Sequence, residues 1–200
     1  MVPLFKSQFS VGKSILTSEK ILDIAKINQL EKVVLLEDTF YGFRVFNKLF
    51  QEEGIPLVFA KNNQGIQDLK RISSNAALND RNSLVLSEYG ESDFENLKVC
   101  VPFYDSYVFN NLFHFGLSHI DIKHLDPVYF IEDNNHPFDF QIKSVIDNLG
   151  VKTQTAKTIL HHNKDEFEAL QMYKASCSRS QGRAPTFQRP NLDHFCSDDF

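Results

Sequence analysis

The chain has 200 residues, of which 42% are hydrophobic and 24% charged, a composition typical of a folded globular protein and not of a disordered chain. A formal net charge of −5 argues against broad binding to a nucleic-acid backbone, which requires a positive surface. No apolar run approaches the roughly eighteen residues of a membrane span, and the first ten residues lack the apolar centre of a signal peptide, so we expect a cytoplasmic protein.

The cysteine and aromatic content give further expectations about the kind of protein. The three cysteines form no CxxC pair and no metal-ligand spacing, so we expect reduced thiols. Aromatic usage is unusual, with 19 Phe, 6 Tyr and no Trp. Rings at this frequency predict a core built from phenylalanine, with Phe46 and Phe109 inside it, in preference to a surface on which bases stack.

Strands and helices alternate along the first part of the chain. Residues 1–10 predict a short strand, and Thr17 or Ser18 is expected to cap a helix over residues 15–25. Gly65 is expected to form the turn before the helix that carries Ile66, Leu69 and Ile72 at helical spacing. The remaining predicted elements here are a strand at 32–36, a helix from Phe43 to Gly54, a strand at 56–60 and a helix at 66–78.

The same alternation continues to the C-terminus. Because strands and helices alternate throughout, we expect an α/β fold with a parallel sheet, one domain over residues 1–175 and a C-terminal connector over 176–200. The predicted elements are strands at 83–86 and 97–102 around an acidic loop at 88–95, a helix at 107–115, a strand at 128–132, a helix at 140–149, a strand at 151–159 and a helix at 165–175.

Five stretches of the sequence, at residues 4–10, 35–42, 60–65, 155–166 and 191–200, resemble the PHP (polymerase and histidinol phosphatase) domain at the N-terminus of bacterial DNA polymerase III alpha subunits. The passage Ala60-Lys61-Asn62 with Gly65 resembles a strand-to-helix passage of that family. Residues 4–10 are similar to its first motif, His-x-His-[Ser/Thr]-Glu-Tyr-Ser, and residues 35–42 to its second, which contains Asp-His-Gly. Residues 155–166 resemble a passage that carries Asp and His two residues apart, and residues 191–200 the segment that leads to the polymerase body. The resemblance implies a distorted, seven-stranded PHP-type β/α barrel, shortened here.

The places of the family's metal ligands hold other residue types in this chain. By the resemblance they are occupied by Leu4, Lys6, Leu36, Glu37, Thr158 and Leu160. Leucine, lysine and threonine cannot replace a neutral imidazole in a site for divalent ions, so no metal cofactor is expected. The alternative is a rearranged site for zinc or manganese, for which the candidate residues are Glu37, Asp38, Asp105, Glu132, His161 and His162.

Each candidate also has a structural interpretation. Glu37 and Asp38 follow a strand and could cap the next helix, as could Asp105 or Ser106 before residue 107. His161 and His162 are expected to be partly exposed at a strand end.

Two further sets of polar residues have their own alternatives. Residues 129–140, with Glu132, Asp133 and His136, could hold a single ion or form a turn that Asn and Pro stabilise. Lys6 and Arg44 could attract an anion at the place where the metals would have been.

The leading functional hypothesis is a degenerate PHP-like domain that acts in DNA replication as a non-catalytic interaction or structural module. Its partner would be a replicative polymerase chain or another replisome protein, as in a split-gene arrangement of the kind found in large phages, which would place it in the host cytoplasm. The segment 189–200 would bind that partner through the apolar anchors Leu192, Phe195 and Phe200; a frayed terminus is the alternative. The rival functions are a metal-dependent phosphoesterase or proofreading 3′–5′ exonuclease with a rearranged site, and a remnant without activity.

Overall fold

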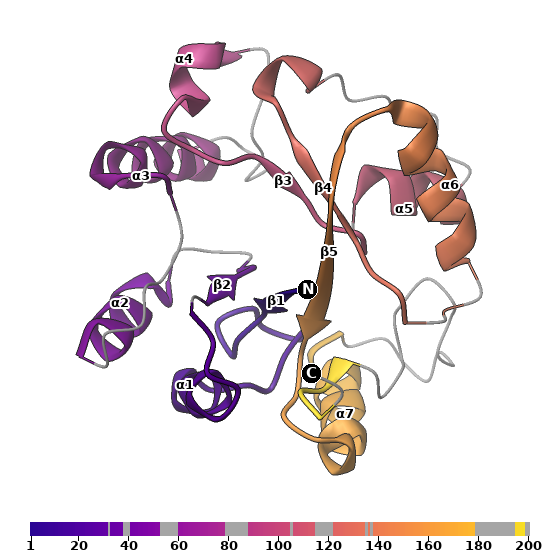
Figure 1. Cartoon of the computed structure of the whole chain (residues 1–200). Coiled ribbons are helices and arrows are strands. Elements are labelled where there is room, and N and C mark those ends of the chain that lie inside the picture. Colours follow the sequence, from indigo (N-terminus) through magenta and orange to yellow (C-terminus); the bar gives the residue numbers. More distant parts are fainter. Residues whose placement is uncertain are drawn as a thin grey trace. The chain divides into compact units, whose positions relative to one another are not determined.

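The computed structural model shows a mixed α/β fold with parallel strands, in which helices and strands alternate along the chain (Figure 1). It describes residues 1–31, 33–37, 41–52, 60–78, 88–104, 106–114, 122–134, 136, 138–178 and 195–198. These belong to two compact units, each made from separate stretches of chain. Unit 1 comprises Met1–Val58, Glu132–His136 and Thr155–Phe200, and unit 2 comprises Phe59–Ile131 and Pro137–Gln154.

The strands pair in parallel, as the alternation predicts. Strand β1 (Val2–Phe5) pairs with β2 (Val34–Leu35) and with β5 (Lys152–Ile159), and β3 (Cys100–Val101) pairs with β4 (Val128–Ile131). The strand order is β2-β1-β5-β4-β3. The α/β prediction is therefore confirmed.

The seven-stranded barrel stays a prediction, since the described residues contribute five strands. The strands expected at 56–60 and 83–86 fall outside the described residues, apart from Ala60.

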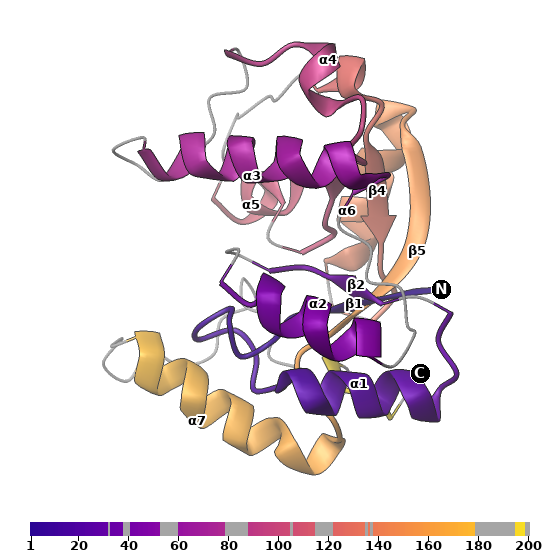
Figure 2. The ribbon, with the colours of Figure 1, turned by 90° about the vertical axis from the view of Figure 1, so that its left-hand side faces the viewer.

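Three helices, α1 (Ser18–Ile27), α2 (Phe43–Glu52) and α7 (Phe167–Ser178), belong to unit 1 (Figure 2). The side chain of Thr17 accepts a hydrogen bond from the Lys20 N–H at 3.2 Å and caps α1, as predicted. The helix begins at Ser18, later than expected. Its apolar face joins a core cluster formed by Phe5, Leu16, Ile21, Leu22, Ile24, Ala25, Val33, Phe46, Phe50 and Ile159.

Strand β1 is shorter than the strand expected over residues 1–10. After Phe5 the chain turns, with the Ser10 N–H bonded to Ser7 O at 2.9 Å and the Lys13 N–H bonded to Ser10 O at 3.0 Å. These local bonds replace the pairing that a longer strand would need.

Unit 2 contains α3 (Asn63–Leu78), α4 (Glu91–Phe94), α5 (Tyr107–His114), the 3₁₀ turn Lys123–Leu125 and α6 (Asp139–Leu149). The prediction of a turn at Gly65 is wrong, because Gly65 lies inside α3 and is buried. A Cβ atom there would lie 2.2 Å from the carbonyl oxygen of Asn96, so close packing explains the glycine. The acidic loop at 88–95 contains a helix, whose Asp93 carboxylate accepts the Gly90 N–H at 2.9 Å.

Two predicted helix ends are confirmed in unit 2. The hydroxyl of Ser106 accepts the Phe109 N–H at 3.1 Å and so caps α5. Gly150 ends α6 with a φ of 62°, in the left-handed region that glycine adopts without strain. Phe109 is 2% exposed and, in unit 1, Phe46 is fully buried, so both belong to cores as predicted.

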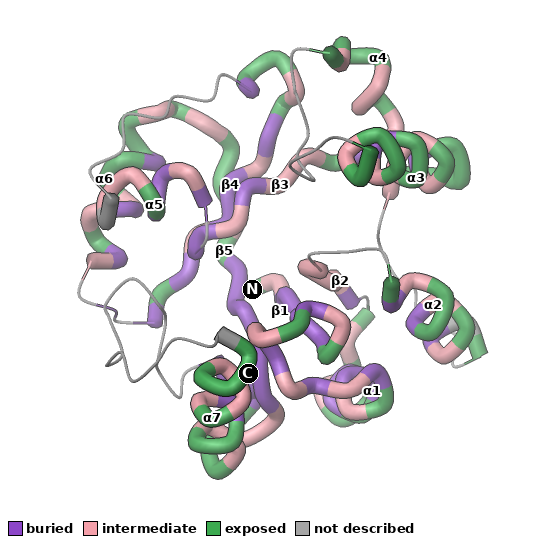
Figure 3. Tube along the Cα trace, turned by 180° about the vertical axis from the view of Figure 1, so that it is seen from behind, coloured by how far each residue is buried: buried purple, intermediate pink, exposed green. Residues whose placement is uncertain are grey.

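Burial changes along β5 (Figure 3). Lys152–Gln154 belong to unit 2 and are exposed or half-buried, and Thr155, where the last stretch of unit 1 begins, is exposed. Ala156 to Ile159 are buried in unit 1. Within the described part of the chain, no helix combines the length and apolar character needed to cross a bilayer.

Candidate functional site

The carboxyl ends of β1, β2 and β5 meet at one edge of the sheet in unit 1. Leu4 lies opposite both Val34 and Thr158 in the parallel ladders. Beyond the paired residues, the Lys6 N–H bonds to Ile159 O at 3.2 Å and the Leu36 N–H to Phe5 O at 2.8 Å. The places matched by resemblance to the family's ligands are on three separate stretches of chain, and they lie at or just beyond these adjoining strand ends. Within a stretch, places two positions apart lie on the same face, because alternate residues of a strand share a face. They are buried or half-buried, with Leu4 inaccessible and Leu160 7% exposed.

Glu37 binds the loop that follows β1. Its Oε1 accepts the Ser7 N–H at 2.9 Å and its Oε2 accepts the Ser10 hydroxyl at 2.5 Å. The interpretation of Glu37 as a cap of the following helix is therefore wrong, because its carboxylate is directed to a loop 30 residues earlier. This arrangement joins the ends of β1 and β2.

Glu132 is a buried carboxylate bound to β5. It follows β4 and is 1% exposed. Its Oε2 accepts the Thr158 N–H at 3.0 Å and the Asn134 side-chain amide at 3.2 Å, and its Oε1 accepts the Thr158 hydroxyl. A carboxylate can be buried when hydrogen bonds of this kind compensate for the lost hydration. Thr158, at the place of a family ligand, is thus a hydrogen-bond donor to a carboxylate.

The other polar residues near this edge differ in exposure. Lys6 is buried, whereas Arg44 is exposed on α2, and the anion site suggested for the two stays a prediction. In the stretch after β4, His136 is buried and Asp133 is exposed.

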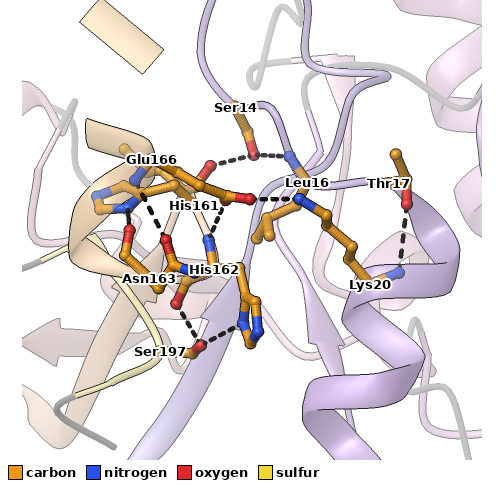
Figure 4. A network of polar contacts seen from close by, with 10 residues as sticks. Ser14, Leu16, Thr17, Lys20, His161, His162, Asn163, Glu166 and Ser197 are labelled. Atoms are coloured by element: carbon orange, nitrogen blue, oxygen red, sulfur yellow. Dashed lines mark hydrogen bonds and ion pairs between the residues drawn. The ribbon is translucent and has the colours of Figure 1, made fainter. Parts of the chain in front are cut away.

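His161 and His162 follow β5 and have different roles (Figure 4). His161 is fully buried, and its Nδ1 donates to the Asn163 carbonyl at 2.8 Å, so the expectation of partial exposure is wrong for this residue. His162 is half-buried, and its Nδ1 lies 2.9 Å from the hydroxyl of Ser197. Ser197 itself donates to the His162 carbonyl at 2.5 Å. Since the hydroxyl proton is directed to a carbonyl, the pair is not arranged as a nucleophile and its base.

Glu166 joins the turn after β5 to α1. Its carboxylate forms an ion pair with Lys20 and accepts the His162 N–H at 2.9 Å (Figure 4). Burial alone would raise the pKa of Glu166, but the hydrogen bonds from Lys20 and from the His162 N–H outweigh it and hold the pKa below its usual value.

The C-terminal segment 195–198, which we call the strap, extends the edge of β5. Cys196 forms a parallel bridge with His161, the Leu160 N–H bonds to Phe195 O at 2.8 Å, and the Ser197 N–H bonds to His162 O at 2.9 Å. Phe195 is 1% exposed, so this predicted partner anchor is part of the interior of unit 1. The frayed-terminus alternative does not describe residues 195–198. Leu192 and Phe200 lie outside the described residues.

Buried serines of the loop before α1 are the site residues that the sequence analysis missed. The hydroxyl of Ser14 lies 2.7 Å from the carbonyl oxygens of both Lys6 and Leu160. It also accepts the Leu16 N–H at 3.1 Å (Figure 4). Ser7 and Ser10 are also fully buried. The available sequence signal was the occurrence of these serines in a short polar stretch after a strand. Hydroxyl groups at such a place can bind the polar groups of neighbouring strand ends.

Among the described residues at this edge, the places matched to the family's ligands supply few groups that could bind a divalent ion. Leu4, Leu36 and Leu160 offer no ligand atom, and the donor bonds from Thr158 and Asn134 occupy the Glu132 carboxylate. Among the residues that the structure describes, no three His, Cys, Asp or Glu side chains form a group that could hold a metal ion. Asp38 and Asp105 lie outside the described residues, and the absence of a metal cofactor stays a prediction.

Comparison with known proteins adds no family assignment. No model of a protein family matches the chain, and no curated protein matches it.

Proposed function

We propose that the chain is a degenerate PHP-like domain that acts in DNA replication as a non-catalytic interaction or structural module. The observation that carries the proposal is the strand register in unit 1. Three sequence stretches were matched to the resembling family independently, and their ligand places fall at the adjoining ends of β1, β2 and β5. A chance resemblance of three short stretches has no reason to follow adjacent strand ends on one edge.

The internal contacts at this edge support a module without catalysis. Glu37 binds Ser7 and Ser10, and Glu132 binds Thr158, so both carboxylates hold loops and strands together. A metal-dependent phosphoesterase needs its carboxylates and imidazoles directed to the ions that bind the substrate.

The first experiment tests for residual catalysis. The purified chain is assayed for metal content by elemental analysis and for 3′–5′ exonuclease and phosphoesterase activity with added manganese or zinc. We expect less than one equivalent of metal and no turnover. Two or more equivalents, with activity that is lost in Glu132→Gln, would establish the alternative function as an enzyme.

The second experiment tests for the partner. The chain is immobilised and offered a replicative polymerase chain that has the palm, fingers and thumb but no PHP domain of its own. We expect a stable complex. A polymerase that carries its own PHP domain is the matched control and should not bind, because its own domain fills that place. Equal failure of both polymerases to bind would contradict the proposal.

A further inference from the structure

The strap is held by the main chain in the way that a sheet edge holds an added strand. The carbonyl of Phe195 accepts the N–H groups of Leu160 at 2.8 Å and of His161 at 3.3 Å. The Ser197 N–H donates to the His162 carbonyl at 2.9 Å. Sheet edges bind extended peptides through main-chain bonds of this kind, and contacts of the peptide side chains then give selectivity.

Three side chains of the strap also make contacts of their own. The ring of Phe195 is buried, with the residue 1% exposed. The hydroxyl of Ser197 donates to the His162 carbonyl at 2.5 Å and lies 2.9 Å from Nδ1 of the same residue (Figure 4). The carboxylate of Asp198 accepts the Lys164 N–H at 3.0 Å. The site therefore suits a peptide with an aromatic residue, a hydroxyl two positions later and a carboxylate directly after it.

The residues that receive the strap need an occupant. Leu160 is 7% exposed and His161 is fully buried. Backbone N–H groups at a buried sheet edge need an acceptor, and the Phe195 carbonyl supplies one to both residues. An empty site would expose an unpaired edge, together with the apolar surface that the Phe195 ring covers.

A second copy of the chain presents the same site. The hydrogen bonds described above join the strap to residues 160–164, so a strap would make these bonds equally well with its own copy or with another. Residues 179–194 join α7 to the strap. An extended chain gains about 3.3–3.6 Å per residue, so a connection of this length is long enough to reach a neighbouring copy. Exchange of an identical element between protomers loses no contact and is a low-cost route to a dimer.

We propose that residues 160–164 form an acceptor site for an extended peptide, and that two copies of the chain form a dimer by exchanging straps through it. The inference rests on the contacts of the strap within unit 1 and does not depend on the proposed function. In a single copy the strap competes for the site at an effective concentration on the order of 1 mM, as expected for a flexibly linked segment. The exchange is therefore expected in concentrated protein.

Light scattering of a chain that can be cut tests the exchange between copies. A protease recognition sequence is placed within residues 179–194, and the chain is incubated below its melting temperature at concentrations from micromolar to millimolar. We expect a dimer whose fraction rises with concentration and which becomes monomeric when the connection is cut, because the cut separates each strap from its own copy. A dimer that survives the cut, or monomer alone at every concentration, would overturn the exchange.

Peptide binding tests the acceptor site without any dimer. A fluorescent peptide of residues 193–200 is added to the cut monomer, which keeps every residue of the site, and fluorescence anisotropy reports the replacement of the cut segment. We expect binding that is at least about tenfold weaker for the same peptide with Phe195→Ala, because the ring is buried. A peptide of the same composition in scrambled order is the matched control and should not bind. Equal binding of all three peptides, or no binding of the first, would overturn the acceptor site.

Discussion

Glu132 and Thr158 are joined by two hydrogen bonds, from the threonine N–H and from its hydroxyl to the two carboxylate oxygens. The pair links the residue that follows β4 to the buried half of β5. Resemblance to a metal-binding family placed a missing ligand at Thr158, and the structure gives this position a donor role. A small residue that can donate twice, through its N–H and its hydroxyl, supplies a donor to each oxygen of this buried carboxylate.

Phe46 and Phe109 should each contribute strongly to stability. Phe46→Ala and Phe109→Ala are expected to lower the free energy of unfolding by about 3–5 kcal/mol, because both rings are buried. Phe140→Ala is the control, since that residue is 65% exposed and should cost little. Chemical denaturation of the three variants gives the comparison. Equal losses at all three positions would contradict the core assignment.

Gly65→Ala should destabilise unit 2 despite the higher helix propensity of alanine. The new Cβ would lie 2.2 Å from Asn96 O and 2.8 Å from the Cβ of Ala60, so the backbone must shift, at a cost of about 1–3 kcal/mol. At Gly90 the nearest atom to a new Cβ is Ser92 Oγ at 3.9 Å, and Gly90→Ala should be nearly neutral. A melting temperature unchanged in Gly65→Ala would show that the packing there is loose.

Removal of the strap should destabilise unit 1. A chain that ends at residue 194 loses the buried Phe195 ring and the bonds that Leu160 and His162 make to the strap, and Phe195→Ala alone should cost about 3–5 kcal/mol. Deletion of residues 199–200 alone is the control and should leave the melting temperature close to that of the full chain. Identical thermal unfolding of the long truncation and the full chain would refute a structural role for the strap.

Acid should weaken the junction between α1 and the turn after β5. The pKa of Glu166 in the folded chain lies below its ordinary value of 4.5, because hydrogen bonds from Lys20 and His162 outweigh the effect of burial. Its contribution to stability is therefore fully present above the ordinary glutamate pKa and is lost as the pH falls through the lowered one. Unfolding of Glu166→Gln should depend less on pH in this acidic range, whereas Glu168→Gln, exposed on α7, should follow the wild type. A Glu166→Gln profile parallel to the wild type would disprove the linkage.

Elements with a strong local pattern could be predicted from the sequence. The helix that begins at Phe43 and the helix that ends at Gly150 follow from apolar spacing and a glycine stop, and both are present. Local sequence signals failed to predict the structure where contacts between distant parts of the chain determine it. Gly65 follows a turn-like sequence, but its lack of a side chain is required by Asn96, 31 positions away.

The candidate site was harder to predict because its contacts join distant parts of the chain. Glu37 and Ser7 are separated by 30 positions, and Ser14 and Leu160 by 146. Polar residues at the start of a loop gave no indication of these partners, and local capping was the simpler interpretation for Glu37. His161 was expected at a solvent-facing strand end, but the strap, whose pairing has no sequence signal, covers that edge.

The interleaving of the two units has a consequence for the order of events during synthesis. β1 emerges first from the ribosome, yet its partner β5 begins at Lys152, and the strap follows at residue 195. Unit 1 therefore cannot close until nearly the whole chain has been translated, while all of unit 2 ends at Gln154. Until Lys152 and the residues after it have been translated, a nascent chain would hold β1 without its partner β5, so that neither a chain stalled before Lys152 nor an expressed N-terminal fragment could complete unit 1.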